Sequence, residues 1–312
     1  MSTLLVTHPC FVLHDTGPGH PERPDRMRAI DKVMGHDLFK SLARQDAPWR
    51  DDVETAIVRV HPQSYFDHIQ ALRPPAGSPG VHLDADTVLS PGSWEPAMRA
   101  VGAGLMAVDE VMTGKVRNAF CQVRPCGHHA ETATAMGFCF FNNVAVAARH
   151  AQVAHGAERV AIIDWDVHHG NGTQDIFWSD KNVFFASTHQ MPLYPGTGAL
   201  GETGAGNVWN APLRPNDGGE QFREAMMSRI LPALRNFGPD LILISAGFDA
   251  HRDDPLANLR LVEDDFGWAT EQLVEVAEKH CRGRIVSVLE GGYDLAALAR
   301  STAVHVRRLM DA

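Results

Sequence analysis

The stretch IIDWDVHHGNG, residues Ile162 to Gly172, determines how the whole chain is interpreted. It begins with apolar, β-branched residues, which are typical of a buried strand in a parallel sheet, and then changes abruptly to acids, histidines and glycines. Asp166 and His168 are two positions apart, so both side chains can face the same way at a strand end. A carboxylate and an imidazole are suitable zinc ligands, and a catalytic zinc has three protein ligands and one open position. The stretch therefore predicts a zinc site whose third ligand comes from elsewhere in the chain.

Short apolar runs alternate with helical stretches on both sides of this segment. We expect strands at residues 3–7, 56–60, 119–123, 159–164, 183–187, 241–246 and 285–289. We expect helices at residues 96–112, 142–155, 219–236, 264–280 and 295–310, and a further helix that starts at Pro24 after a polar loop. This alternation predicts βαβ units and a three-layer α/β/α fold with a central, mostly parallel sheet. No repeat or domain boundary is evident, so residues 1–312 are expected to form a single catalytic domain.

The composition excludes several classes of protein. The chain has 28 Lys and Arg against 38 Asp and Glu, a net charge of −10, which disfavours general nucleic-acid binding. The N-terminus has no basic segment followed by an apolar core, and no run approaches the roughly 18 apolar residues of a membrane span. Five cysteines without paired spacing are typical of reduced thiols in a cytoplasmic protein. We therefore expect a cytoplasmic protein that binds neither nucleic acid nor membrane.

Four polar clusters follow expected strands at their carboxyl ends, where open α/β sheets gather their sites. They are residues 127–129, residues 164–168, Asp249, and residues 290–293. One pair of histidines alone is more often structural or on the surface. Four clusters at equivalent strand ends, which together supply ligands, bases and a phenol, indicate an active site instead.

Six motifs in this order resemble the zinc-dependent histone deacetylase superfamily: RPCGHHAE, GFCFFNN, DWDVHHGNGTQ, YPGTG, SAGFDAHRDDPL and LEGGYD. This superfamily includes histone deacetylase-like amidohydrolases and acetylpolyamine amidohydrolases, and HHGNG and LEGGY are similar to its class II branch. The resemblance runs from about residue 14 to residue 294. It implies an arginase-deacetylase-like fold and a zinc-dependent deacetylase that hydrolyses N-acyl amides, such as acetyl-lysine in proteins or acetylated polyamines.

The resemblance also implies roles for individual residues. The matches to the zinc ligands are Asp166, His168 and Asp249. The matches to the catalytic groups are His128, His129, Asp164, Asn171 and Tyr293. Asn171 stands where class I relatives carry Asp, and an amide raises the pKa of its histidine partner less than a carboxylate would. This suits a base that is neutral near pH 7.

Further matches concern the substrate channel and a monovalent cation. The expected channel residues are Gly137, Phe138, Tyr194 and Leu256. Many relatives have Phe at Tyr194, and one branch of polyamine deacetylases is marked by Glu at Leu256. Arg26 resembles the arginine beside an acetate-release cavity, while Asp164 and Ser187 match groups that bind potassium. Asp84 and Asp86 are both candidates for an acid at the channel rim.

Two other functions are compatible with parts of this pattern. An arginase-like hydrolase would share the sheet but needs two metals about 3.5–4 Å apart, and hence more carboxylates. A catalytically silent acyl-lysine binding module would be expected to lack a metal ligand, a tandem histidine or the tyrosine, all of which are present. The sequence predicts an acylated amine as substrate without distinguishing a peptide from a polyamine. An oligomer is compatible with the sequence.

Overall fold

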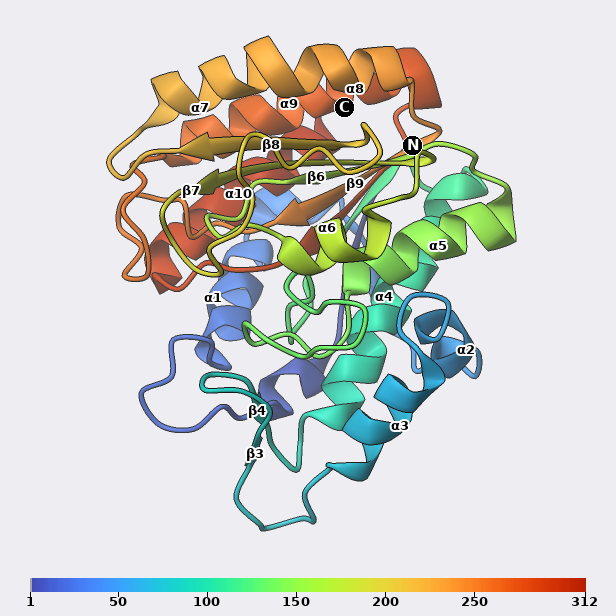
Figure 1. Cartoon of the computed structure of the whole chain (residues 1–312), viewed down its shortest axis with the longest axis vertical. Coiled ribbons are helices and arrows are strands. Elements are labelled where there is room, and N and C mark those ends of the chain that lie inside the picture. The colour runs from blue at the N-terminus through green and yellow to red at the C-terminus, as the bar shows by residue number, and fades with distance from the viewer. Residues whose placement is uncertain (1) are drawn as a thin grey trace.

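The computed structural model describes residues 2–312 and contains an eight-stranded parallel sheet between two layers of helices (Figure 1). The strands lie in the order β2-β1-β5-β10-β9-β6-β7-β8. Their bounds are β1 Thr3–Thr7, β2 Ala43–Asp46, β5 Asn118–Cys121, β6 Val160–Asp164, β7 Val183–Gln190, β8 Val208–Leu213, β9 Leu241–Ala246 and β10 Ile285–Leu289. A separate two-stranded antiparallel ribbon consists of β3 Val81–His82 and β4 Val88–Leu89.

Ten α-helices occur within residues 2–312. They are α1 Asp25–Met34, α2 Val53–Ile57, α3 Gln63–Ala71, α4 Trp94–Met112, α5 Asn143–His155, α6 Asn171–Phe177, α7 Gly219–Ala225, α8 Leu231–Phe237, α9 Glu263–Cys281 and α10 Leu295–Met310. Single turns of 3-10 helix lie at Pro9–Leu13 and Asp37–Phe39, and a π-helical turn lies at Met226–Ile230. In the described part of the chain, no helix has both the length and the apolar character that a membrane crossing requires.

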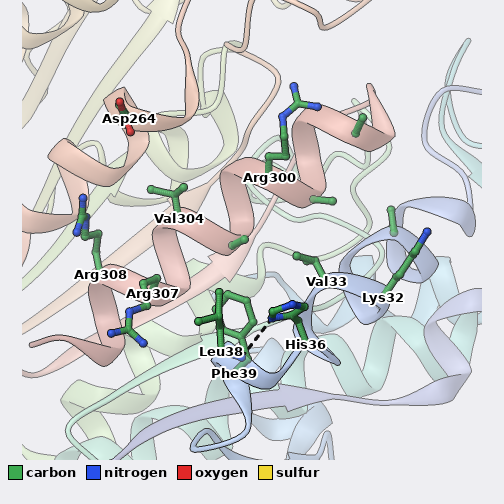
Figure 2. A pocket seen from close by; sticks show the side chains of 14 residues that line it. Lys32, Val33, His36, Leu38, Phe39, Asp264, Arg300, Val304, Arg307 and Arg308 are labelled. Carbon is green, nitrogen blue, oxygen red and sulfur yellow. Dashed lines mark hydrogen bonds between the residues drawn. The ribbon is translucent and has the colours of Figure 1, made fainter.

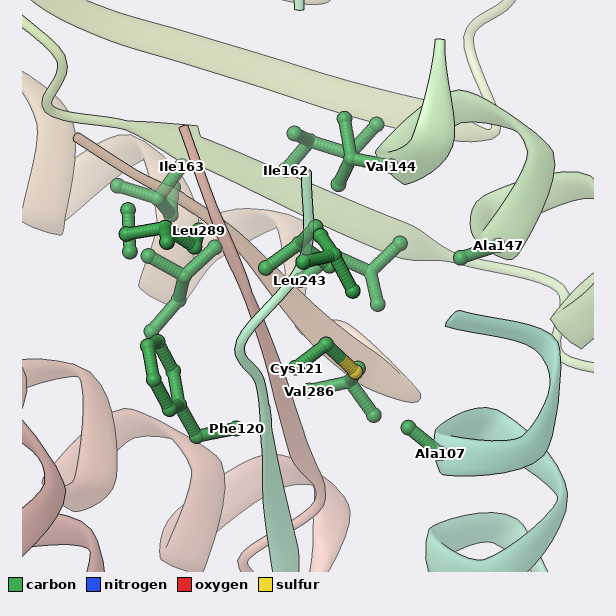
Figure 3. Packing of buried hydrophobic residues seen from close by; sticks show 14 of the residues in the cluster. Ala107, Phe120, Cys121, Val144, Ala147, Ile162, Ile163, Leu243, Val286 and Leu289 are labelled. Carbon is green, nitrogen blue, oxygen red and sulfur yellow. The ribbon is translucent and has the colours of Figure 1, made fainter. Parts of the chain in front are cut away.

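The central strands are apolar on both faces because helices cover both faces of the sheet. In β5, the Cys121 thiol lies 3.6 Å from the Ala103 carbonyl oxygen of α4, whereas the Phe120 ring lies 5.6 Å from the His305 ring of α10. Figure 3 shows Ala107 of α4 and Ala147 of α5 among the buried residues of the sheet. The small side chains of these helices let them approach the strands closely.

The prediction of a strand at residues 56–60 was wrong, because helix α2 occupies Val53–Ile57. The buried residues of this segment, Val53, Ala56 and Ile57, have the three- and four-residue spacing of a helix face. The run of β-branched residues had suggested a strand instead. The neighbour of β1 is β2, whose sequence ARQD is mostly exposed and carries no apolar signal.

The single helix expected at residues 219–236 is divided into α7, the π-helical turn and α8. Pro232 lies at the start of α8, and a proline inside a helix removes one hydrogen bond and clashes with the preceding turn. The helix therefore widens into a π-helical turn just before the proline.

The two ends of the described chain meet at the amino edge of the sheet. The Thr3 hydroxyl, at the start of β1, donates a hydrogen bond of 3.1 Å to the Leu309 carbonyl oxygen near the end of α10. The Asn118 side chain at the start of β5 donates to the same oxygen at 2.9 Å. The C-terminal end of α10 therefore lies against the amino ends of β1 and β5.

Candidate active site

The four polar clusters follow four strands that are neighbours in the middle of the sheet. These strands lie in the order β5-β10-β9-β6, so the loops after them meet at one place on the carboxyl edge. All four run parallel to their neighbours. Side chains from positions as far apart as residues 128 and 293 therefore surround a single site.

Three side chains form a compact group of metal-ligand type. Ligand atoms of Asp166, His168 and Asp249 all lie within 4.8 Å of one another, and the three residues are buried. Nδ1 of His168 is 3.1 Å from Oδ1 of Asp166 and 3.1 Å from Oδ2 of Asp249. Two carboxylates and one imidazole match the donor preferences of Zn²⁺.

Two glycines allow these carboxylates to come together. A Cβ atom on Gly247 would lie 2.1 Å from Oδ2 of Asp166, and one on Gly291 would lie 2.3 Å from Oδ2 of Asp249. Burial, together with the nearby Asp166 carboxylate, raises the pKa of Asp249 to about 7. A divalent cation between the carboxylates would remove this repulsion, so the donor set fits a bound metal ion.

The tandem histidines lie beside this group with different hydrogen-bond partners. Nδ1 of His128 is 2.9 Å from Oδ2 of Asp164, and Nδ1 of His129 is 2.7 Å from Oδ1 of Asn171. Burial opposes protonation of His128, but the Asp164 and Asp166 carboxylates hold its pKa well above the usual range. Burial, together with the charge of His128, holds the pKa of His129 well below that range. Environments that push two neighbouring pKa values apart mark distinct acid and base roles.

Two carboxylates that support these histidines were not assigned a role from the sequence. The Asn171 amide donates to Oε1 of Glu131 at 2.8 Å, which directs the amide oxygen toward His129. Oε2 of Glu290 accepts hydrogen bonds from the backbone N–H groups of Gly127 and His128, with N···O distances of 2.7 Å and 3.2 Å. A buried carboxylate needs such partners. The position of Glu290 directly after an apolar strand was therefore a usable signal in the sequence.

Tyr293 is held by its backbone as well as by packing. Its N–H donates to Oδ2 of Asp254 at 2.7 Å. Fully buried Arg26 donates from Nε to the Gly292 carbonyl oxygen at 2.7 Å and from Nη1 to Oε1 of Glu22 at 3.0 Å. Burial raises the pKa of Tyr293 well above its usual value, so its hydroxyl stays protonated and can donate a hydrogen bond. The acetate-release role of Arg26 stays a prediction.

A cavity of about 470 Å³ connects this group to the surface. His129, His168 and Tyr293 line this cavity. The four expected channel residues line it as well, and these are Gly137, Phe138, Tyr194 and Leu256. Phe138 has φ +70°, an unfavourable value for a non-glycine residue, and its N–H donates to the Thr87 hydroxyl at 3.0 Å. Tyr194 is 43% exposed, so it stands at the mouth rather than in the depth of the cavity.

The two rim acids differ in what they do. Oδ1 of Asp84 accepts the N–H groups of Asp86, at 2.8 Å, and of Thr87, at 2.5 Å. Its other oxygen is 3.4 Å from the Gly137 nitrogen. Within residues 2–312 the Asp86 carboxylate forms no such hydrogen bonds, and it lines the same cavity. Asp84 therefore organises the loop, whereas the Asp86 carboxylate has no such contacts in the described chain, and the role of either as a rim acid stays a prediction.

The two residues expected at a monovalent cation lie on paired strands. Asp164, the last residue of β6, is the register partner of Ser187, which lies inside β7. The Ser187 hydroxyl is hydrogen-bonded to Nδ1 of His189 at 2.9 Å. Potassium binding stays a prediction.

A larger cavity, of about 700 Å³, lies between α1 and α10 (Figure 2). Its lining combines apolar side chains, mostly alanine and valine, with four basic residues, which are Lys32, Arg300, Arg307 and Arg308. None of the expected site residues lines it. Cavity size alone would therefore have pointed to the wrong part of the molecule.

Comparisons with known proteins identify the family and the fold of this chain. A family model described as histone deacetylase domain matches residues 20–309. Protein slr0245 of Synechocystis sp. is 43% identical over 305 residues, which cover 96% of this chain and 97% of that protein. The histone deacetylase-like amidohydrolase of Pseudomonas aeruginosa is 41% identical over 284 residues, which cover 89% of this chain and 73% of that protein. The crystal structure of the HDA15 HD domain matches with a TM-score of 0.91 at 36% identity, covering 99% of this chain and 88% of that one, which confirms the three-layer fold.

Proposed function

Because this chain belongs to the histone deacetylase family, we propose that it is a zinc-dependent amidohydrolase that removes acyl groups from amines. The substrate would be a linear amide such as acetyl-lysine in a protein or an acetylated polyamine. The five buried, unpaired cysteines support action in a reducing compartment such as the cytoplasm.

One observation carries this proposal. A cavity lined by His129, His168 and Tyr293 reaches a buried group of two carboxylates and an imidazole, of which His168 is a member. A metal-assisted hydrolysis requires these elements together: a Lewis-acid site, a base, and a donor for the developing oxyanion.

The metal would be held by Asp166, His168 and Asp249. It would supply Lewis-acid polarisation of the amide carbonyl and a lower pKa for the attacking water. His129 donates its Nδ1–H to Asn171, which leaves Nε2 with a lone pair to accept the proton of that water. The protonated His129 then gives this proton to the leaving amine. His128, held protonated by Asp164, contributes fixed positive charge.

Tyr293 would donate its hydroxyl proton as a hydrogen bond to the carbonyl oxygen, and more strongly to the oxyanion that develops from it. Phe138 and Gly137 would line the apolar stalk of the acyl-amine. The free carboxylate of Asp86 would meet a cationic or amide group of the substrate at the rim. Asp164 and Ser187 would contribute to a potassium site close to the metal.

A competition assay tests the proposal. Zinc-loaded protein would be given acetyl-lysine peptides, N-acetylputrescine, N-acetylspermidine and a trifluoroacetyl-lysine reporter, and kcat/KM would be measured for each. Activity that is lost on chelation and restored by Zn²⁺ is expected. Turnover of none of these by folded, zinc-bound protein would refute the amidohydrolase proposal. The order of kcat/KM values then identifies the substrate class.

A further inference from the structure

A second group of metal-ligand side chains lies away from the active site, between α4 and α5. Ligand atoms of Asp109, His150 and His155 lie within 4.8 Å of one another. Nε2 of His150 is 2.6 Å and Nε2 of His155 is 2.7 Å from the same oxygen, Oδ1 of Asp109. We propose that this group, which we call the helix-end triad, is a second binding site for a divalent transition metal such as Zn²⁺.

The helix-end triad is placed by the close packing of two helices. Asp109 is in the last turn of α4, while both histidines are on α5, and Figure 1 shows these helices side by side. A Cβ atom on Gly104 would lie 3.4 Å from the Ala147 Cβ atom, so the small residues permit the close approach. The two imidazoles and the carboxylate are therefore brought together by rigid elements, as a precise metal site requires.

The Asp109 carboxylate is oriented by its second oxygen. Oδ2 accepts a hydrogen bond of 2.5 Å from Nη1 of Arg50, which leaves Oδ1 to face the two imidazoles. Ligating carboxylates in metal sites are commonly held in this way by an outer hydrogen bond. Arg50 is itself paired with Asp52, at 2.8 and 3.0 Å. Two carboxylates and one guanidinium leave one net negative charge when the imidazoles are neutral, and this charge favours a cation.

The protonation requirements of the triad can also be met. Nδ1 of His150 has no hydrogen-bond partner in residues 2–312, so its proton can sit there and leave Nε2 as a lone-pair donor. His155 is the last residue of α5, where the free carbonyl groups of a helix C-terminus favour positive charge. A tetrahedral zinc ion with bonds of about 2.0–2.1 Å holds its ligand atoms roughly 3.3 Å from one another. Each histidine Nε2 atom must therefore move roughly 0.6 Å away from Oδ1 of Asp109 when zinc binds.

The site is accessible to solvent on one side. The His150 side chain is 5% exposed, whereas those of His155 and Asp109 are 16% and 29% exposed. Water can therefore complete the coordination of a bound ion. Two imidazoles and one carboxylate suit Zn²⁺, Ni²⁺ and Cu²⁺ better than Mg²⁺ or Ca²⁺. Along the axis of α5, His150 and His155 lie about 10 Å and about 18 Å from the first residue of that helix.

Metal counting in variants of the whole chain tests the second site. Protein stripped with a chelator would be dialysed to equilibrium against buffered micromolar free Zn²⁺, and bound zinc would be measured by elemental analysis. We expect two equivalents in the unmodified chain, one in Asp166→Ala, one in His155→Ala, and none in the double variant. His68→Ala, which replaces an exposed histidine near the end of α3, is the matched control and should retain two.

A second measurement distinguishes metal binding from loss of folding. Zn²⁺ should raise the melting temperature of Asp166→Ala but leave that of the double variant unchanged, and both should have native circular dichroism. An unchanged count in His155→Ala, or no zinc in Asp166→Ala, would overturn the proposal. An arginase-like pair of metals in the active site would also leave two equivalents in His155→Ala.

The second site and the proposed deacetylase activity can fail separately. Zinc held by Asp166→Ala and lost in the double variant would establish the second site even without amide hydrolysis. Hydrolysis by a chain that binds only one zinc would leave the proposed function intact and remove the second site.

Discussion

At the residue scale, the hydroxyl of Tyr293 is the simplest group to remove. Tyr293→Phe should lower kcat by about 10²–10³-fold, because one donor to the oxyanion is lost. The ring is retained, and the backbone bond to Asp254 does not involve the side chain, so stability should change little. Steady-state kinetics with an acetyl-lysine peptide, together with thermal melting, would check both expectations.

Tyr65→Phe is the matched control. Tyr65 is buried, and its hydroxyl donates to the Phe140 carbonyl oxygen. Its removal should cost about 1 kcal/mol of unfolding free energy and leave kcat nearly unchanged. Equal losses of kcat in the two variants would contradict a specific role for the Tyr293 hydroxyl.

Gly137 offers a steric test of the position of His129. Its φ is +56°, and a Cβ atom there would lie 2.4 Å from Cδ2 of His129. Gly137→Ala should therefore displace the imidazole and lower kcat by about 10²-fold, since small misplacements of a catalytic group are costly. Gly114 also has a positive φ, +74°, but nothing lies within 4 Å of its added Cβ. Gly114→Ala, measured by the same kinetic assay, should retain kcat, and a comparable loss there would implicate general backbone strain.

The sequence identified most residues that meet in the site, but not the partners that support them. Asp166, His168 and Asp249 stand out as ligand types after strands, and the structure brings them together. The choice between Asp84 and Asp86 depended on which carboxylate accepts backbone N–H groups, which residue type alone does not determine. Residue-level chemistry was thus predictable, whereas hydrogen-bond partners required the folded loops.

At the scale of the element, two glycines of α4 provide a matched pair. A Cβ atom on Gly102 would lie 2.1 Å from the Pro48 carbonyl oxygen, whereas one on Gly104 would be in contact at 3.4 Å with the Ala147 Cβ atom. Gly102→Ala should lower the unfolding free energy by about 1–3 kcal/mol through overpacking. In Gly104→Ala, tight packing opposes a helix-propensity gain of up to about 1 kcal/mol.

Urea unfolding of the two α4 variants would measure this difference. Gly102→Ala is expected to be the less stable of the two, because its new methyl group would overlap a backbone oxygen, whereas that of Gly104→Ala would lie at contact distance from the Ala147 Cβ atom. Similar unfolding free energies would show that the 47–48 segment is able to retreat from α4.

Elements were predictable where one periodicity dominated the segment. The bounds of β10 and α10 agree with the expected ranges, because their apolar residues follow a clear pattern between turn residues. The strand predicted at residues 56–60 was wrong because β-branched residues favoured a strand, whereas the buried positions 53, 56 and 57 have the spacing of a helix. The edge strand β2 was missed because an edge position does not require apolar residues.

At the scale of the whole molecule, buried neutral histidines should make stability depend on pH. Burial lowers the pKa of His61 to about 4, of His189 to about 4 and of His305 to about 3. As the pH falls, these histidines therefore become protonated in the unfolded chain before they do so in the folded protein. The contribution of these neutral histidines to the unfolding free energy is fully present above about pH 6.5. It is lost as the pH falls below that value, by about 1.4 kcal/mol per pH unit for each histidine.

His305→Gln isolates one of these protons. The His305 ring is hydrogen-bonded to the hydroxyls of Thr270, at 2.7 Å, and Ser287, at 2.9 Å, which an amide can also engage. Between pH 7.5 and pH 5, the variant should lose about 2 kcal/mol less unfolding free energy than the unmodified chain. Urea unfolding at both pH values would measure this, and identical losses would show that His305 does not become protonated on unfolding.

The general architecture was predictable from alternating strands and helices, but the strand order was not. The site exists because β5, β10, β9 and β6 are adjacent, although residues 118 and 289 are far apart in the chain. Local periodicity contains no information about which strands pair. The resemblance to a family implied which residues share a site, but it gave no strand order.

The hydrogen bond between Thr3 and Leu309 has a practical consequence for how the molecule can be handled. Both ends of the described chain emerge at the amino edge of the sheet, whereas the channel opens beyond the carboxyl edge. A strand of five residues separates these edges by about 17 Å. A bead, fluorophore or carrier protein attached through either end would therefore face away from the channel. Immobilised in this way, the molecule would present its channel to passing substrate.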